Sequence, residues 1–141
     1  MRVWLGTVAL GALLVSAACD SSTDIPGGRY YRSFAFQRTD SVQLERITPN
    51  TGFRTIILNG MFEAPTTCQD LKPQIEDDAR NLLITITATA QQSTCQNASL
   101  GYFHYNVVMG SFFPGAYRVE VVHKDSRGSR PIYTANVTVN N

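Results

Sequence analysis

Residues 82–90 read Leu-Leu-Ile-Thr-Ile-Thr-Ala-Thr-Ala, and this stretch decides the fold class. Apolar side chains at every second position, separated mostly by threonine, are typical of a strand with one buried and one exposed face. An amphipathic helix would instead repeat its apolar residues every three or four positions. The stretch therefore predicts a β-strand that covers a hydrophobic core.

The same alternation recurs along the chain, at Tyr117-x-Val119-x-Val121 and again over residues 133–139. We expect further strands at residues 30–37, 42–48, 54–62, 71–76 and 102–109, separated by turn-forming clusters at 49–52, 77–81, 114–115 and 126–128. Seven or eight short strands at this spacing predict an all-β protein, a single antiparallel β-sandwich.

The composition limits the classes of function. A chain of 141 residues, 43% of them apolar, is long enough for one domain with a real core. Without Arg2, which lies in a segment expected to be removed, eleven basic and eleven acidic residues remain. A chain without net charge has no general attraction for nucleic acid, so we expect no nucleic-acid partner. It also contains no phosphate-binding glycine loop, and we expect no cofactor.

The first residues have the layout of a secretory signal. Arg2 is followed by an apolar run over residues 3–15 and by the small residues Ser16-Ala17-Ala18. This run is shorter than the ~20 residues that a membrane-spanning helix needs. The sequence therefore predicts a signal peptide at 1–18, a polar tether at 19–29 and the β-sandwich domain at 30–141.

The residues Ala17-Ala18-Cys19 resemble the lipobox of bacterial lipoproteins. The resemblance implies that Cys19 is diacylated, becomes the mature N-terminus and holds the protein to a membrane of the cell envelope, on the periplasmic or the cell-surface side. Ser16 stands where that family usually has leucine, so cleavage by the ordinary signal peptidase is the alternative. Which membrane holds the protein is left open.

A second resemblance concerns residues 112–119, Phe-Phe-Pro-Gly-Ala-Tyr-Arg-Val. They are similar to the segment that opens a late strand in immunoglobulin-like and fibronectin-III-like sandwiches. The resemblance implies an immunoglobulin-like sandwich in which the hydroxyl of Tyr117 hydrogen-bonds to backbone upstream. The only tryptophan, Trp4, lies in the signal, so the domain lacks the core tryptophan of antibody-type domains.

The cysteine count fits one lipid anchor and one disulfide. The chain has three cysteines, Cys19, Cys68 and Cys95. Three successive antiparallel strands alternate in direction, so the loops at 63–70 and 91–101 are expected at the same pole. We therefore predict a disulfide between Cys68 and Cys95, which by loop entropy would stabilise the domain by roughly 3–4 kcal/mol.

Continuing the alternation places the loops at 38–41 and 124–130 at that same pole. We call it distal, because the tether enters the first strand from the opposite, proximal pole. Loops held by a rigid sandwich often carry the binding site. The candidate partner-binding residues are Gln96, Asn97, Arg127 and Arg130. The partner would be an envelope or extracellular protein or a glycan.

Other residues that could carry chemistry have ordinary alternatives. His104 and His123 could form a zinc pair across the sheets, but packed or solvated strand histidines are expected. The acidic run Glu76-Asp77-Asp78 could hydrolyse a glycoside or hold calcium, whereas adjacent acids in a turn are usually solvated. We assign no catalytic residue and no metal ligand.

The sequence thus favours a binding or structural module of the cell envelope, and we do not expect an enzyme. One alternative is a periplasmic lipoprotein that inhibits a lysozyme or protease with an exposed loop. A second is a small hydrolase that uses the acidic residues 76–78.

Overall fold

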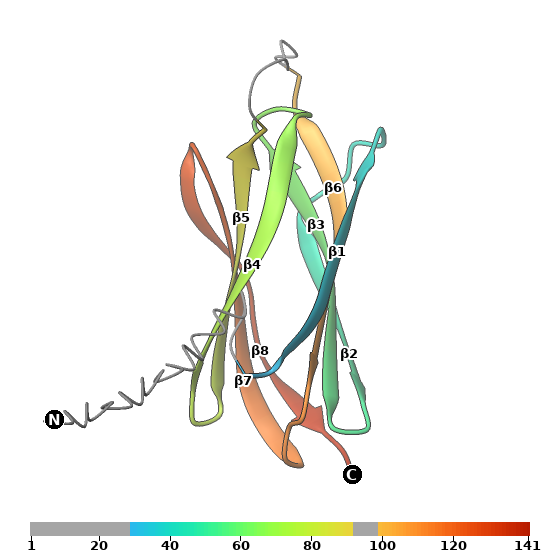
Figure 1. The fold of residues 1–141 in the computed structure, drawn as a ribbon, viewed down its shortest axis with the longest axis vertical. Helices are drawn as coiled ribbons and strands as arrows, with labels where there is room; N and C mark the ends of the chain where they lie inside the picture. The colour runs from blue at the N-terminus through green and yellow to red at the C-terminus, as the bar shows by residue number, and fades with distance from the viewer. Residues whose placement is uncertain (1–28, 92–98) are drawn as a thin grey trace, which may run out of the picture.

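The computed structural model describes residues 29–91 and 99–141, which form two packed sheets of four strands each (Figure 1). The strands are β1 (Tyr31–Thr39), β2 (Arg46–Gly52), β3 (Thr55–Ala64), β4 (Gln69–Asp78), β5 (Asn81–Ala90), β6 (Gly101–Gly110), β7 (Gly115–Asp125) and β8 (Gly128–Val139). The strand order is β1-β6-β3-β2 in one sheet and β4-β5-β7-β8 in the other. The expected all-β sandwich is confirmed.

The core lies between the two sheets and is built from the inward side chains of the alternating strands. In β5, Leu82, Ile84, Ile86 and Ala88 are buried, as their alternation predicts. Strands β3, β6 and β7 supply most of the other large buried side chains, among them Ile56, Leu58, Phe62, Phe103, Tyr105, Val107, Met109, Tyr117, Val119 and Val121. Burial of this apolar surface is the main force that holds the two sheets together.

One strand pair departs from the antiparallel pattern expected from sequence. Strands β5 and β7 pair in parallel, with Leu82 opposite Val119 and Ile84 opposite Val121. The strand between them in the chain, β6, belongs to the other sheet. The chain crosses the core and returns, so β5 and β7 run in the same direction. Hydrophobic alternation cannot reveal this, because it is the same in both kinds of pairing.

The turn expected at residues 49–52 is wrong, since these residues lie inside β2. The reversal comes just after them, where Arg54 adopts a φ of 52°. Pro49 is accommodated because β2 is an edge strand, on which a residue without an N–H group costs no ladder hydrogen bond. Residues 42–44, expected to begin this strand, lie in the connection from β1 to β2.

The loops at 38–41, 63–70 and 124–130 lie together at the distal pole, as expected, whereas most of the loop at 91–101 lies outside the described residues. The ends of the strands meet there in register, with Thr39 opposite Tyr102, Ala64 opposite Gly101, and Gln69 opposite Ala90. The β7–β8 hairpin reaches the same end, where its Arg127 contacts Glu63 at 3.1 Å. Figure 1 shows the end of β1, the β3–β4 turn and the β7–β8 hairpin together at the top of the molecule.

The proximal pole is closed by aromatic side chains. Tyr30, which precedes β1, stacks on Phe112 with the ring centroids 4.2 Å apart, and Phe112 packs edge-on against Tyr117. The Tyr117 hydroxyl donates to the backbone oxygen of Phe113 at 3.0 Å, which is the backbone contact expected for this tyrosine. No helix within 29–91 and 99–141 has the length and apolar character needed to cross a membrane.

Candidate functional site

Four of the residues singled out from sequence, Cys19, Cys95, Gln96 and Asn97, lie outside the described residues. Cys68 lies in the loop between β3 and β4, and its backbone oxygen accepts a hydrogen bond from the Gln91 N–H at 3.1 Å. The loop with Cys68 is therefore held against the start of the segment that contains Cys95. The disulfide and the lipid on Cys19 stay predictions.

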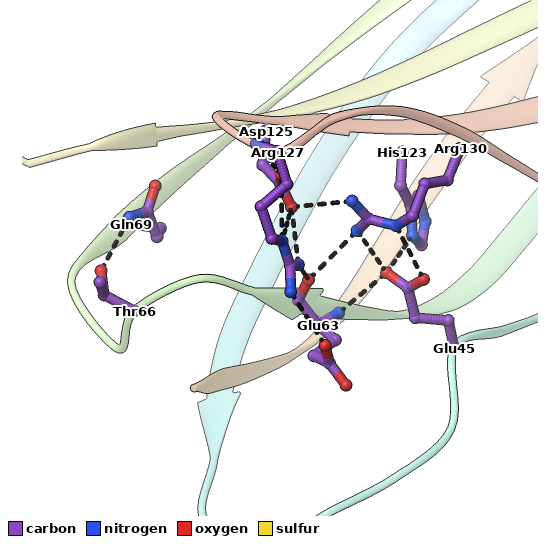
Figure 2. A network of polar contacts seen from close by, with 8 residues as sticks. All are labelled: Glu45, Glu63, Thr66, Gln69, His123, Asp125, Arg127 and Arg130. Carbon is purple, nitrogen blue, oxygen red and sulfur yellow. Dashed lines mark hydrogen bonds and ion pairs between the residues drawn. The ribbon is translucent and has the colours of Figure 1, made fainter. Parts of the chain in front are cut away.

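Arg127 and Arg130 are bound by carboxylates of the domain itself (Figure 2). Both guanidinium groups donate to Asp125, Arg127 at 2.8 Å and Arg130 at 3.0 Å, and the Asp125 side chain is fully buried. Arg127 also pairs with Glu63 at 3.1 Å, and Arg130 pairs with Glu45 at 3.0 Å. The two arginines proposed from the sequence for partner binding are thus largely neutralised by three acids of the domain.

The same network continues inward to a buried histidine. His123 is 0% exposed and stacks on Phe62, with ring centroids 4.4 Å apart. Because a carboxylate only accepts hydrogen bonds, His123 Nδ1 donates to Glu45 Oε1, at 2.9 Å. On its other side, Nε2 shares a hydrogen bond of 2.8 Å with the Tyr105 hydroxyl. The imidazole therefore links the two sheets at the distal end of the core.

The pKa values show how tightly these acids are held. Burial acts to raise the pKa of Glu45, but hydrogen bonds from His123, Arg130 and the backbone of Glu63 outweigh it and lower the pKa from 4.5 to about 2. Asp125 follows the same balance: burial is outweighed by bonds from Arg127 and Arg130, and its pKa falls from 3.8 to about 2. Both acids are therefore ionised at neutral pH.

Gly60 in β3 makes room for this arrangement. A Cβ atom at Gly60 would lie 2.1 Å from the ring of Tyr105. The Tyr105 ring is buried, and burial followed by the nearby charge of Glu45 raises the pKa of its hydroxyl, which stays protonated. A larger residue at 60 would displace the ring and break its bond to His123.

The network has the properties of a structural element. Its central groups are buried, and each side chain is satisfied by another member of the network. Burying charges in this way gives modest net stability, but removing one partner is costly because the other stays buried. We therefore interpret the network as the joint that fixes the distal pole, and look for a binding surface elsewhere.

A groove of about 380 Å³ crosses the outer face of the sheet β1-β6-β3-β2. Two rows of residues line the groove, and each row takes one residue from each of β1, β6, β3 and β2. The first row is Gln37, His104, Met61 and Arg46, and the second is Ala35, Asn106, Asn59 and Thr48. All of these except Met61 and Asn106 are exposed. The groove thus presents amide, hydroxyl, imidazole and guanidinium groups above an apolar Met61, and its lining has no carboxylate.

A second hollow lies on the outer face of the other sheet, and its chemistry is opposite. Its lining includes Glu76, Asp77, Asp78 and Glu120, with Arg118 as the only basic residue. Asp77 forms an ion pair of 2.7 Å with Arg29. The acidic run of the sequence therefore lines a hollow of about 480 Å³ on the outer face of the sheet, between β4, β5 and β7.

The two histidines lie in different environments. His123 is buried, whereas His104 lies on the outer groove. Among residues 29–91 and 99–141, no group of three or more histidine, cysteine and acidic side chains is placed to hold a metal ion. The packed and the solvated strand histidine that we expected are both observed.

Comparison of the chain with protein family models, with curated proteins and with solved structures finds no match. Glu45, Glu63, Tyr105 and Asp125 were not predicted from the sequence as members of the network. One signal for the network was present in the sequence. His123 and Asp125 continue the every-second-residue pattern of Val119 and Val121, whose side chains face inward. A histidine and an acid in that phase predict buried partners, because buried polar groups need hydrogen bonds.

Proposed function

We propose that this protein is a lipid-anchored binding module of the cell envelope, and that the groove on the sheet β1-β6-β3-β2 binds a glycan chain that carries carboxylate groups. The observation that carries the proposal is the groove lining: planar hydrogen-bonding amides, an imidazole and one guanidinium group, without an acid. An acidic sugar chain supplies the complementary groups.

The chemistry of the lining fits sugar hydroxyls. The side-chain amides of Gln37, Asn59 and Asn106 each contain a donor and an acceptor, as a hydroxyl does. Asn106 already donates to Asn59 at 2.9 Å, so the two amides are held in a fixed orientation. Groups that are fixed before binding reduce the entropy cost of contact.

The charge of the lining favours an acidic ligand. Arg46 forms no ion pair within the described residues and is exposed. A guanidinium group can bind a carboxylate with two parallel hydrogen bonds, which gives affinity and geometric specificity. The groove draws on all four strands of the sheet, and so suits an extended chain better than a compact molecule.

The anchor is the second part of the proposal. Diacylated Cys19 would retain the domain at a membrane, because two acyl chains hold a protein that one chain releases. Intact mass of the protein extracted from membranes should show a diacylglyceryl group, and Cys19→Ala should lose it. An unmodified mature chain in the soluble fraction would contradict this part alone.

Calorimetric titration with uronic-acid oligosaccharides, and with neutral glucose oligosaccharides of equal length, tests the groove. We expect the acidic series to bind, and Arg46→Ala to weaken that binding about tenfold, the loss expected for one charge-assisted contact. The matched control is Arg118→Ala, which removes an exposed arginine from the acidic hollow and should change nothing.

Three results would count against the groove. Binding of neither series overturns the glycan ligand. Equal binding of both series removes the role of charge. A loss in Arg118→Ala equal to that in Arg46→Ala would place the binding surface on the other sheet.

A further inference from the structure

Two phenylalanines project from the proximal pole. Phe53, in the turn between β2 and β3, is 73% exposed, and Phe113, between β6 and β7, is 69% exposed. Both turns lie at the lower end of the molecule in Figure 1, at the end where β1 begins. At this exposure most of each ring lies outside the core and is accessible to a partner.

Arg54 joins the two turns and holds them in place. Its side chain donates to the backbone oxygen of Phe112 at 2.8 Å, and its own backbone oxygen accepts from the Phe112 N–H at 3.2 Å. The guanidinium group lies over the ring of Phe113, 5.5 Å from its centroid. The backbone N–H of Arg54 also donates to Asn140 at 3.3 Å. The phenylalanines are therefore carried by fixed turns.

Three arginines at this pole keep their charge uncompensated. Arg32, Arg54 and Arg80 form no ion pair with any acid of the described chain; they bind backbone oxygens, hydroxyls and aromatic rings instead. The neighbouring β4–β5 end carries the acidic hollow, in which Asp77 is paired with Arg29, while Glu76, Asp78 and Glu120 form no ion pair within the described residues. Aromatic residues next to arginines that lack acidic partners match the boundary between lipid headgroups and acyl chains.

The chain enters the domain at this same pole. Arg29, the first described residue, pairs with Asp77 at the β4–β5 end, and Tyr30 packs on Phe112. Ten residue steps separate Arg29 from Cys19 and can span at most about 35 Å. An acylated Cys19 would therefore keep this pole close to the bilayer.

From this coincidence we propose that the proximal pole docks on the bilayer, with Phe53 and Phe113 inserted at the acyl boundary and the arginines facing anionic headgroups. The inference rests on the membrane location in the proposed function, but not on the glycan groove. Docking fixes the orientation of the sandwich, so that the distal pole points away from the membrane.

Tryptophan fluorescence can test the docking, because the only tryptophan, Trp4, lies in the predicted signal. A chain that starts at Asp20 with a polyhistidine tag in place of Cys19 is bound to vesicles that contain nickel-chelating lipid and about 30% phosphatidylglycerol. The tag supplies the tether, so the result does not depend on acylation. Single variants Phe53→Trp and Phe113→Trp are compared with Val42→Trp, whose site is 79% exposed in the β1–β2 connection at the distal pole.

We expect brominated acyl chains to quench the tryptophan fluorescence of Phe53→Trp and Phe113→Trp at least about twofold, because both side chains would lie at the acyl boundary. The fluorescence of Val42→Trp should be unchanged. Absence of quenching at both proximal sites, or equal quenching at Val42→Trp, overturns the docking. If docking is observed but native Cys19 carries no lipid, only the anchor proposal fails.

A second measurement removes the phenylalanines. In chains without a tether, the double variant Phe53→Ser/Phe113→Ser should cosediment with anionic vesicles about tenfold less than the chain that keeps both phenylalanines. The matched control, Val42→Ser/Leu44→Ser, removes two exposed apolar residues of the distal pole and should sediment normally. Equal sedimentation of both double variants would contradict the proposal. Thermal melting checks that each variant is folded.

Discussion

The two poles of the sandwich are closed by different chemistry. At the distal pole, the buried His123 bonds to Glu45, Glu45 pairs with Arg130, and Asp125 pairs with Arg127 and Arg130, so these charges are satisfied within the domain. At the proximal pole, Tyr30 and Phe112 close the core with stacked rings, and nearby arginines bind backbone oxygens. The two arginines and three acids of the distal network thus compensate one another, whereas Arg32, Arg54 and Arg80 near the proximal pole form no ion pair within the described residues. A basic cluster in a sequence says little about binding until its internal partners are known.

The largest expected effect comes from the centre of the distal network. His123→Ala should lower the free energy of unfolding by about 4 kcal/mol, because it leaves a cavity beside Phe62 and removes the partners of Glu45 and Tyr105. Urea unfolding followed by circular dichroism measures it. The control is His104→Ala, an exposed histidine, which should cost less than about 0.5 kcal/mol. Equal losses would mean that the network does not hold the pole.

The predicted disulfide would give the distal pole a second constraint. Cys95→Ser should lower the free energy of unfolding by about 3 kcal/mol, since the unfolded chain gains the entropy of an open loop. Adding a reductant should lower the free energy of unfolding of the wild-type protein by the same amount. It should not alter the free energy of unfolding of Cys95→Ser. Peptide mapping without reduction identifies the bond directly, and free thiols at both positions would refute it.

Acid should loosen the distal pole before the proximal one. Glu45 and Asp125 have folded-state pKa values of about 2, below their usual 4.5 and 3.8, so their stabilisation is present above pH 4.5 and is lost as the pH falls towards 2. We expect the unchanged protein to lose about 2–3 kcal/mol over this range. In Glu45→Gln/Asp125→Asn the dependence should be much weaker. An unchanged pH profile in that variant would place the acid-sensitive groups elsewhere.

The smallest expected effect belongs to the proximal pole. Tyr117→Phe removes the hydroxyl that donates to Phe113 and keeps the ring, so it should cost about 1 kcal/mol. Tyr133→Phe is the control, since that hydroxyl bonds no other described residue. Thermal melting of the two variants shows whether this backbone contact contributes; identical melting temperatures would show that it does not.

Much of the fold could be predicted because alternation is a local property. The strand at 82–90 and the gathering of loops at one pole follow from short-range patterns and from the parity of successive strands. The same reasoning placed the end of β2 wrongly, because Pro49, Asn50 and Gly52 favour turns unless an edge strand accommodates them. It also could not distinguish the parallel β5–β7 pair from an antiparallel one.

The candidate site was much less accessible to this reasoning. Arg127 and Arg130 were identified, but their acidic partners were not, and the groove residues gave no signal at all. Gln37, Asn59 and Asn106 are ordinary polar residues in their own strands. They form one lining only because β1, β3 and β6 are neighbours in the sheet.

The sequence by itself determined the strand periodicity, the inward side of the clearly alternating strands at 82–90, 117–121 and 133–139, and the pole at which the loops at 38–41, 63–70 and 124–130 lie. Only the tertiary structure decided which charges meet. Glu45 and His123 are 78 positions apart, and their contact joins the two sheets. Sheet order and register set such contacts, and both depend on the packing of the whole core. A period of two residues specifies which side chains face inward, but not which strand lies opposite them.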